Sequence, residues 1–473
     1  MYTGLTRRAF VRNSGLALLA LGLPPEFVTR SLLARTHGAA RRKTLICIFQ
    51  RGAVDGLSMV IPFGEQAYYA RRRSIALGAP ARDGTGVLDL DGFFGLHPSL
   101  EPLSSLFARG ELAIVHAVGS PHPTRSHFDA QDFMETGTPG VKTTTDGWLN
   151  RVLQHSGCSD CGGRTLDDRQ AHATDHAAGQ TGMGTGPILS PSLRGVAMGA
   201  ALPRSLRGEH PALAIEDLDR FGLDGGRNTA LEDSFERAYR TEGGDLISGA
   251  AEDAFDAMRV LRSIEFDSYQ PASNVEYPAG TFGRSLRQIA QLIKADVGVE
   301  IAFADLGGWD THQAQGGLQG QLANRFSELA RGIRALYDDL GDRMDDIVLL
   351  TMSEFGRTIA ENGSGGTDHG HANCMMVMGG SVNGGRVFGD WPGLEPEQLY
   401  QGRDLALTTD FRDVFAELVS GHLGADRLDR IFPGYQSDPR RWRSILASVS
   451  GAGFQGWFPG NGSGTATAGN DHT

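Results

Sequence analysis

Acidic and histidine side chains recur in short segments beside apolar runs of this chain. The densest segment, 366–373, contains Asp368, His369 and His371 within a Gly-rich stretch. Carboxylate oxygens and imidazole nitrogens are the usual ligands of divalent metal ions. The alternative is that Asp368 orders a turn while the two histidines hydrogen-bond nearby backbone. For this segment alone the two interpretations are balanced, so the case for a metal depends on similar segments elsewhere.

Such segments occur next to four other apolar runs, which we interpret as buried strands of an α/β sheet. Ligands of open α/β sheets collect at the carboxyl ends of the strands. In chain order, Asp55 follows the predicted strand 44–50, Ser126 follows 112–118, Asp310 and His312 follow 296–306, Glu354 follows 346–352, and Asp368 to His371 precede 373–378. We therefore expect one or two divalent ions (zinc, manganese or calcium) at one sheet edge, bound by a subset of Asp55, Asp310, His312, Glu354, Asp368, His369 and His371.

Ser126 has the position of a nucleophile, because it lies at a predicted helix start where amide dipoles favour an anionic group. Capping alone also explains this serine, since Ser126 and Asp129 have the spacing of a capping box. Its neighbours Arg125 and His127 complete the candidate catalytic set. The arginine would bind an oxyanion or pair with an acid, and the histidine would be a ligand or an acid/base group. For Arg357 we expect a salt bridge to Glu354.

Strands and helices alternate along the chain, which predicts a mostly parallel sheet sandwiched between helices. Apolar residues with a 3.6-residue period predict a helix over 322–340, and a second helix is predicted over 281–295. Residues 41–450 form the α/β domain, with 154–280 as a large insertion that is partly loop and partly helical, mainly over 228–266. We expect residues 451–473, which are rich in Gly, Ser and Thr, to form a flexible tail. Cys47 and Cys374 lie in apolar runs and are expected to be buried, whereas Cys158 and Cys161 form a CxxC for which a local disulfide, an unpaired loop and a zinc clip all stay open.

The N-terminal 40 residues have the pattern of a twin-arginine export signal. Arg7 and Arg8 precede a short apolar segment, 16–23, which is too short to span a membrane of about 30 Å. We expect recognition by the twin-arginine machinery, delivery to the periplasm or the medium, and no stable membrane anchor in the mature protein.

The chain carries a net charge of −12, and residues 1–40 contribute five Arg and one Glu, so the remainder is near −16. Such an acidic protein is not expected to bind nucleic acid, although a local metal site would attract a small anionic ester.

Four segments together resemble the bacterial domain-of-unknown-function family 1501, whose members commonly begin with a twin-arginine signal. These segments are LICIFQRGAVDGLSMVIP, RSHFDAQDFMETG, GGWDTH and TMSEFGRTIAENGSGGTDHGHAN, spread over residues 45–390. That family is similar to the alkaline phosphatase and sulfatase superfamily, which implies a metal-binding Asp after the first strand, a nucleophile at a helix start, an Asp/His pair and a distal His. The chain departs from this pattern at Phe355, where a His is usual, and in the Asp310–His312 spacing. It also lacks the formylglycine sulfatase motif.

Two functions follow as hypotheses. The first is an exported metal-dependent hydrolase of phosphate or sulfate esters, which the many polar groups at strand ends favour. The second is a non-catalytic exported protein of the same fold with a structural metal, acting in cell-envelope assembly, which the loss of a His at Phe355 favours.

Overall fold

The computed structural model describes residues 42–156, 190–218, 257–261, 264 and 269–447. The predicted export signal, Cys158 and Cys161, most of the helical stretch predicted over 228–266, and the C-terminal tail lie outside the described residues. Within the described ranges, no helix is both long enough and apolar enough to cross a membrane.

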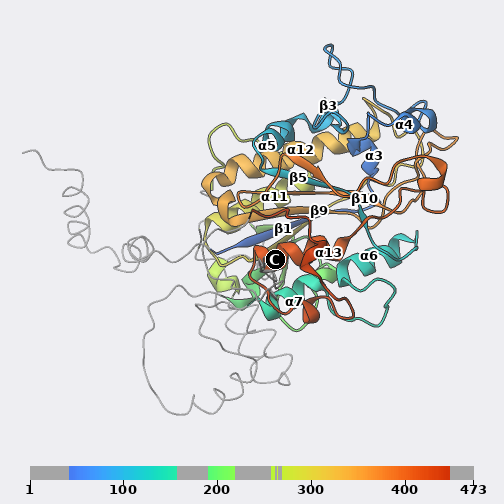
Figure 1. The fold of residues 1–473 in the computed structure, drawn as a ribbon. Coiled ribbons are helices and arrows are strands. Elements are labelled where there is room, and N and C mark those ends of the chain that lie inside the picture. The colour runs from blue at the N-terminus through green and yellow to red at the C-terminus, as the bar shows by residue number, and fades with distance from the viewer. Residues whose placement is uncertain (1–41, 157–189, 219–256, 262–263, 265–268, 448–473) are drawn as a thin grey trace, which may run out of the picture.

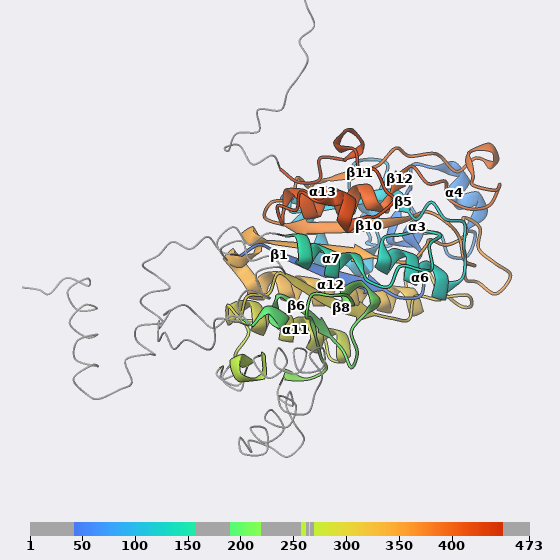
Figure 2. The ribbon, with the colours of Figure 1, turned by 90° about the horizontal axis from the view of Figure 1, so that it is seen from below.

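A nine-stranded sheet runs through the centre of the molecule (Figure 1). Eight strands follow the order β11-β5-β10-β9-β1-β8-β6-β7, and β12 also pairs with β5. Figure 2 shows β6 and β8 on one side of β1 and β10, β5 and β11 on the other. The strands are β1 (Thr44–Gln50), β5 (Leu112–Gly119), β6 (Gly195–Met198), β7 (Leu213–Ile215), β8 (Ile301–Leu306), β9 (Ile347–Met352), β10 (Asn373–Gly379), β11 (Arg386–Phe388) and β12 (Thr409–Asp410).

The sheet is mostly parallel, as predicted. Every pairing is parallel except those of β10, which runs antiparallel to both β5 and β9. All five predicted strands form. The third begins at Ile301 rather than at 296, because Asp296 and Gly298 have positive φ angles of 52° and 95° and form a turn. The predicted insertion also contributes β6 and β7, which extend the sheet beyond β8.

Alternation along β1 explains how helices cover both faces of the sheet. Ile46 and Ile48 belong to an apolar core that also contains residues of α11 (Thr281–Lys294) and α12 (Gln321–Leu340). Leu45, Cys47 and Phe49 belong to a second core, with residues of α7 (Trp148–His155) and α13 (Phe411–Gly421). Figure 1 shows α5 and α12 on one side of the sheet and α6, α7 and α13 on the other.

The remaining elements are short. A three-stranded sheet has the order β2-β4-β3. The bounds are β2 (Val60–Ile61), β3 (Leu88–Asp89), β4 (Gly95–Leu96), α3 (Gly56–Met59), α4 (Gln66–Arg71), α5 (Ser104–Ala108), α6 (His127–Thr136) and α14 (Leu428–Ile431), with 3-10 turns η1 (Pro98–Leu103), η3 (Pro191–Arg194), η4 (Arg204–Leu206), η7 (Gly341–Asp346), η8 (Pro396–Gln398) and η9 (Pro439–Arg441). Cys47 and Cys374 are buried free thiols, as predicted.

The direction of β10 decides where the polar loops meet. β1, β5, β8 and β9 point the same way, so their carboxyl ends share one edge of the sheet. Because β10 is antiparallel to its neighbours, its amino end lies at that same edge. The loop before β10 therefore joins the loops after the other four strands, and residues far apart in sequence become neighbours there.

Candidate metal centre

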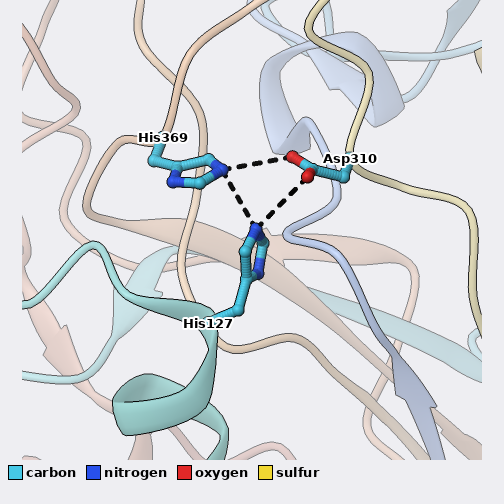
Figure 3. A group of neighbouring side chains, drawn as sticks. All are labelled: His127, Asp310 and His369. Carbon is cyan, nitrogen blue, oxygen red and sulfur yellow. Dashed lines mark hydrogen bonds and ion pairs between the residues drawn. The ribbon is translucent and has the colours of Figure 1, made fainter.

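Three side chains from separate segments meet beyond this edge of the sheet (Figure 3). His127 is the first residue of α6, Asp310 follows β8, and His369 precedes β10. Nε2 of His127 lies 3.0 Å from Nε2 of His369 and 3.5 Å from Asp310 Oδ2. Nε2 of His369 lies 3.1 Å from Asp310 Oδ1. One ligand atom from each residue lies within 4.8 Å of the others, which is close enough for a single ion to bind all three.

His312 lies beside this group, in contact with His369 and Asp310. Its Nε2 lies 2.9 Å from Nε2 of His369 and 3.0 Å from Asp310 Oδ1. We call His127, Asp310, His312 and His369 the histidine cluster. The side chains of Asp310 and His312 are 46% and 39% exposed, so solvent and small molecules reach the cluster.

The hydrogen bonds of the three imidazoles fix their tautomers. Each Nδ1 faces an oxygen acceptor: Glu354 at 2.8 Å from His127, Asp368 at 3.0 Å from His312, and the carbonyl of Arg125 at 2.9 Å from His369. With the proton on Nδ1, each neutral ring has a lone pair on Nε2, and the lone pairs of His127 and His312 both face Nε2 of His369. Nε2 of His369 thus faces two imidazole nitrogens and a carboxylate oxygen. One proton can join only two of these atoms, whereas a metal ion accepts all the lone pairs, so the cluster fits a divalent metal.

Glu354 and Asp368 contact histidines of the cluster rather than its centre. Glu354 is buried and accepts hydrogen bonds from His127 and Gln131. Burial would raise the pKa of Glu354, but these hydrogen bonds hold it below its usual value, so the carboxylate is ionised. Asp368 is exposed and accepts from Nδ1 of His312. Both carboxylates orient imidazoles of the cluster, which is the role that such outer partners have around known metals.

Asp310 is held by Arg357 through a 2.6 Å ion pair. Burial would raise the pKa of Asp310, but the hydrogen bond and charge of Arg357 lower it, so the Asp310 carboxylate is charged. The predicted Arg357–Glu354 salt bridge is therefore wrong, because the guanidinium points across the loops to Asp310. Burial lowers the pKa of His369, against the opposing effect of Asp310.

Asp55 lies at the same edge, but its carboxylate is fully occupied. Arg72 binds both oxygens at 2.6 and 3.0 Å, and Ser58 and Gln315 donate to Oδ2. Burial would raise the pKa of Asp55, but the charge and hydrogen bonds of Arg72 lower it. Both partners of this ion pair are almost fully buried. Asp55 is not in the group that could hold an ion, and it already has a cationic partner within the protein.

His371 also lies outside the histidine cluster. Its ring stacks on Tyr400 at 4.1 Å between centroids and is 7% exposed. Burial lowers the pKa of His371, partly offset by Asp404. Two residues earlier, His369 turns toward Asp310 instead.

Ser126 is the N-cap residue of α6, but its side chain makes no capping hydrogen bond. The predicted capping box does not form, since Asp129 pairs with Lys142 at 2.7 Å. The exposed serine hydroxyl adjoins His127 in the chain. Arg125 pairs with the buried Asp404 at 2.5 Å, while its carbonyl accepts from His369.

Close packing of apolar and backbone groups supports the cluster. The ring centroid of Phe355 lies 5.0 Å from those of both His127 and His369. Gly52, in the turn after β1, has a φ of 116°, and a Cβ there would lie 2.8 Å from the Asp310 nitrogen. The β1 and β8 loops therefore approach each other at a distance that only glycine permits.

A family model described as "Protein of unknown function (DUF1501)" matches residues 42–429. The chain belongs to the DUF1501 family. This confirms the family resemblance of the sequence segments. A search of curated proteins found no match.

Solved structures show distant similarity. The C-terminal periplasmic domain of EcEptC from Escherichia coli, in complex with Zn, is 9% identical with a TM-score of 0.30, covering 72% of this chain and 74% of that chain. Ps i-CgsB, in complex with k-i-k-neocarrahexaose, is 11% identical with a TM-score of 0.35, covering 83% and 75%. No site residue is carried over from either structure.

Proposed function

We propose that the chain is an exported metal-dependent hydrolase of phosphate or sulfate esters. The observation that carries the proposal is the convergence of His127, Asp310 and His369, whose ligand atoms lie 3.0 to 3.5 Å apart, with Nε2 of His312 about 3 Å from both His369 and Asp310. The oxygen partners at each Nδ1 hold the rings in the tautomer that a metal requires. The exposure of Asp310 and His312 favours an accessible catalytic ion over an enclosed structural one.

The donor set favours zinc or manganese over calcium. Imidazole nitrogens suit transition metals, whereas calcium prefers an all-oxygen shell. We also propose a single ion. Asp55 is neutralised by Arg72, and His371 is stacked on Tyr400, so the described residues offer no second set of free ligands beside the histidine cluster.

A divalent ion in the cluster would polarise an ester oxygen and offset the charge that develops on it. Ser126 is our candidate nucleophile, because its hydroxyl is exposed, is not engaged in capping, and adjoins His127 at the start of α6. The free amides of that helix start favour an anionic group beside it. Arg125 is already paired with Asp404, so we assign it the orientation of His369 through its carbonyl rather than binding of an oxyanion.

Metal analysis of His369→Ala and His371→Ala tests the proposal, because the two histidines share a loop but only the first belongs to the cluster. We expect wild type and His371→Ala to retain an equivalent of zinc or manganese after dialysis, and His369→Ala to lose it. Loss from both variants alike, or no metal in wild type grown with zinc and manganese, contradicts the proposed site.

Catalysis is tested separately with p-nitrophenyl phosphate, bis(p-nitrophenyl) phosphate and p-nitrophenyl sulfate. We expect turnover of at least one ester by wild type, its loss in His369→Ala, and a fall of roughly 100-fold or more in kcat for Ser126→Ala with metal content unchanged. Retained metal without turnover of any of these esters supports the non-catalytic alternative.

A further inference from the structure

Arg357 is completely buried and yet lies against a carboxylate of the histidine cluster. A guanidinium charge beside a ligand of a cation opposes metal binding by Coulomb repulsion. The same charge keeps the Asp310 carboxylate ionised, and the hydrogen bonds of Arg357 indicate a second role, in geometry.

The guanidinium joins the loops that carry the site. Nε donates to the carbonyl of Ala53 at 2.7 Å, and Nη2 donates to that of Gly52 at 2.7 Å, both in the turn after β1. Nη2 also reaches the carbonyl of Trp309 at 3.0 Å and Asp310 Oδ1 at 2.6 Å, after β8. Nη1 donates at 2.9 Å to the carbonyl of Thr367, two residues before His369.

We propose that Arg357 is a positioning residue of the metal centre, which fixes the Asp310 carboxylate and the spacing of the loops on either side of it. This inference rests on the proposed metal site. By holding Oδ1, the guanidinium sets the rotation of the carboxylate, and by bridging three loops it sets the separation between Asp310 and His369. A planar group with several donors can do this, whereas the single ammonium of lysine cannot.

Arg72 provides a matched control at the same edge of the sheet. It is equally buried and also makes five hydrogen bonds, to Asp55, Ser58 and the carbonyls of Thr358 and Ile359. None of these partners belongs to the histidine cluster. A general loss of packing should therefore affect Arg72→Lys and Arg357→Lys alike, whereas a positioning role should affect metal binding only in the second.

The experiment measures Co²⁺ affinity and the visible Co²⁺ spectrum of wild type, Arg357→Lys and Arg72→Lys, with folding checked by circular dichroism. Lysine keeps the charge, so the change isolates geometry. We expect the Co²⁺ Kd to rise about 10- to 100-fold and the spectrum to change in Arg357→Lys, with both unchanged in Arg72→Lys. In the Asp310→Asn background, which we expect to bind Co²⁺ weakly, Arg357→Lys should raise the Kd by a smaller factor than it does in the wild-type background.

The outcomes separate the two proposals. Absence of Co²⁺, Zn²⁺ and Mn²⁺ binding by wild type overturns the proposed metal site. Binding by wild type together with an unaltered Kd and spectrum in Arg357→Lys overturns the positioning role alone. If Arg357→Lys does not fold, the same measurements are made on Asp310→Glu. This variant keeps a carboxylate at position 310 but moves that carboxylate away from the Arg357 guanidinium. Wild-type affinity and spectrum in Asp310→Glu then count against the proposal.

Discussion

Replacing Asp55 by Asn tests whether this residue stabilises the fold or binds the ion. In the structure, Asp55 and Arg72 form a buried pair with side-chain exposures of 1% and 0%. The substitution leaves the Arg72 guanidinium buried with only neutral acceptors. Breaking such a pair by removing one partner costs about 3–5 kcal/mol. Asp310→Asn is the matched change at an acidic side chain that is 46% exposed, where we expect about 1–3 kcal/mol.

The assay combines thermal unfolding of metal-free protein with metal analysis of reloaded protein. In a domain of this size, a loss of 4 kcal/mol lowers Tm by about 5 °C, since unfolding entropy grows with chain length. Metal-free samples are needed because a bound ion stabilises the native state. We expect Asp55→Asn to show the larger fall in Tm with full metal content, and Asp310→Asn the smaller fall with metal lost. A small Tm change together with lost metal in Asp55→Asn would refute this reasoning and make Asp55 a ligand.

Three further predictions address other parts of the molecule. Glu354→Gln should raise the metal Kd about 10- to 100-fold, because it removes the anionic acceptor that orients His127; unchanged affinity in metal titrations would contradict this role. Burial lowers the pKa of His422 to about 4. The unfolded chain therefore takes up a proton below pH about 6.5 while the native state does not, and roughly 3 kcal/mol of stability should be lost between pH 6.5 and 4. Urea denaturation at pH 7 and pH 5 should show about 2 kcal/mol of this loss, and an equal fall in stability in His422→Asn would show that another group causes it. Arg7→Lys with Arg8→Lys should hold the protein in the cytoplasm, as cell fractionation would show; unchanged periplasmic delivery would exclude a twin-arginine address.

The sequence alone predicted five central strands, the helices α11 and α12, and the gathering of polar residues at the strand ends. The predicted strands 44–50, 112–118 and 346–352 form buried strands within one residue of the predicted bounds, because a strand covered on both faces is apolar along most of its length. The period of residues 322–340 likewise predicted α12 to within a residue. These signals are local, so they can be read without knowing what each element packs against.

Tertiary structure decided which of the polar residues act together. His369 and His371 are indistinguishable by local pattern, yet one faces Asp310 and the other stacks on Tyr400. Asp55 was a candidate ligand, but Arg72, which lies beyond α3, β2 and α4 and which the sequence analysis did not single out, forms an ion pair with it. Arg357 bonds to loops some 50 to 300 residues away rather than to nearby Glu354. The physical reason is that a charged side chain binds the partner that the packed loops bring to it, and the antiparallel β10 brings its loop to the edge where the other loops end.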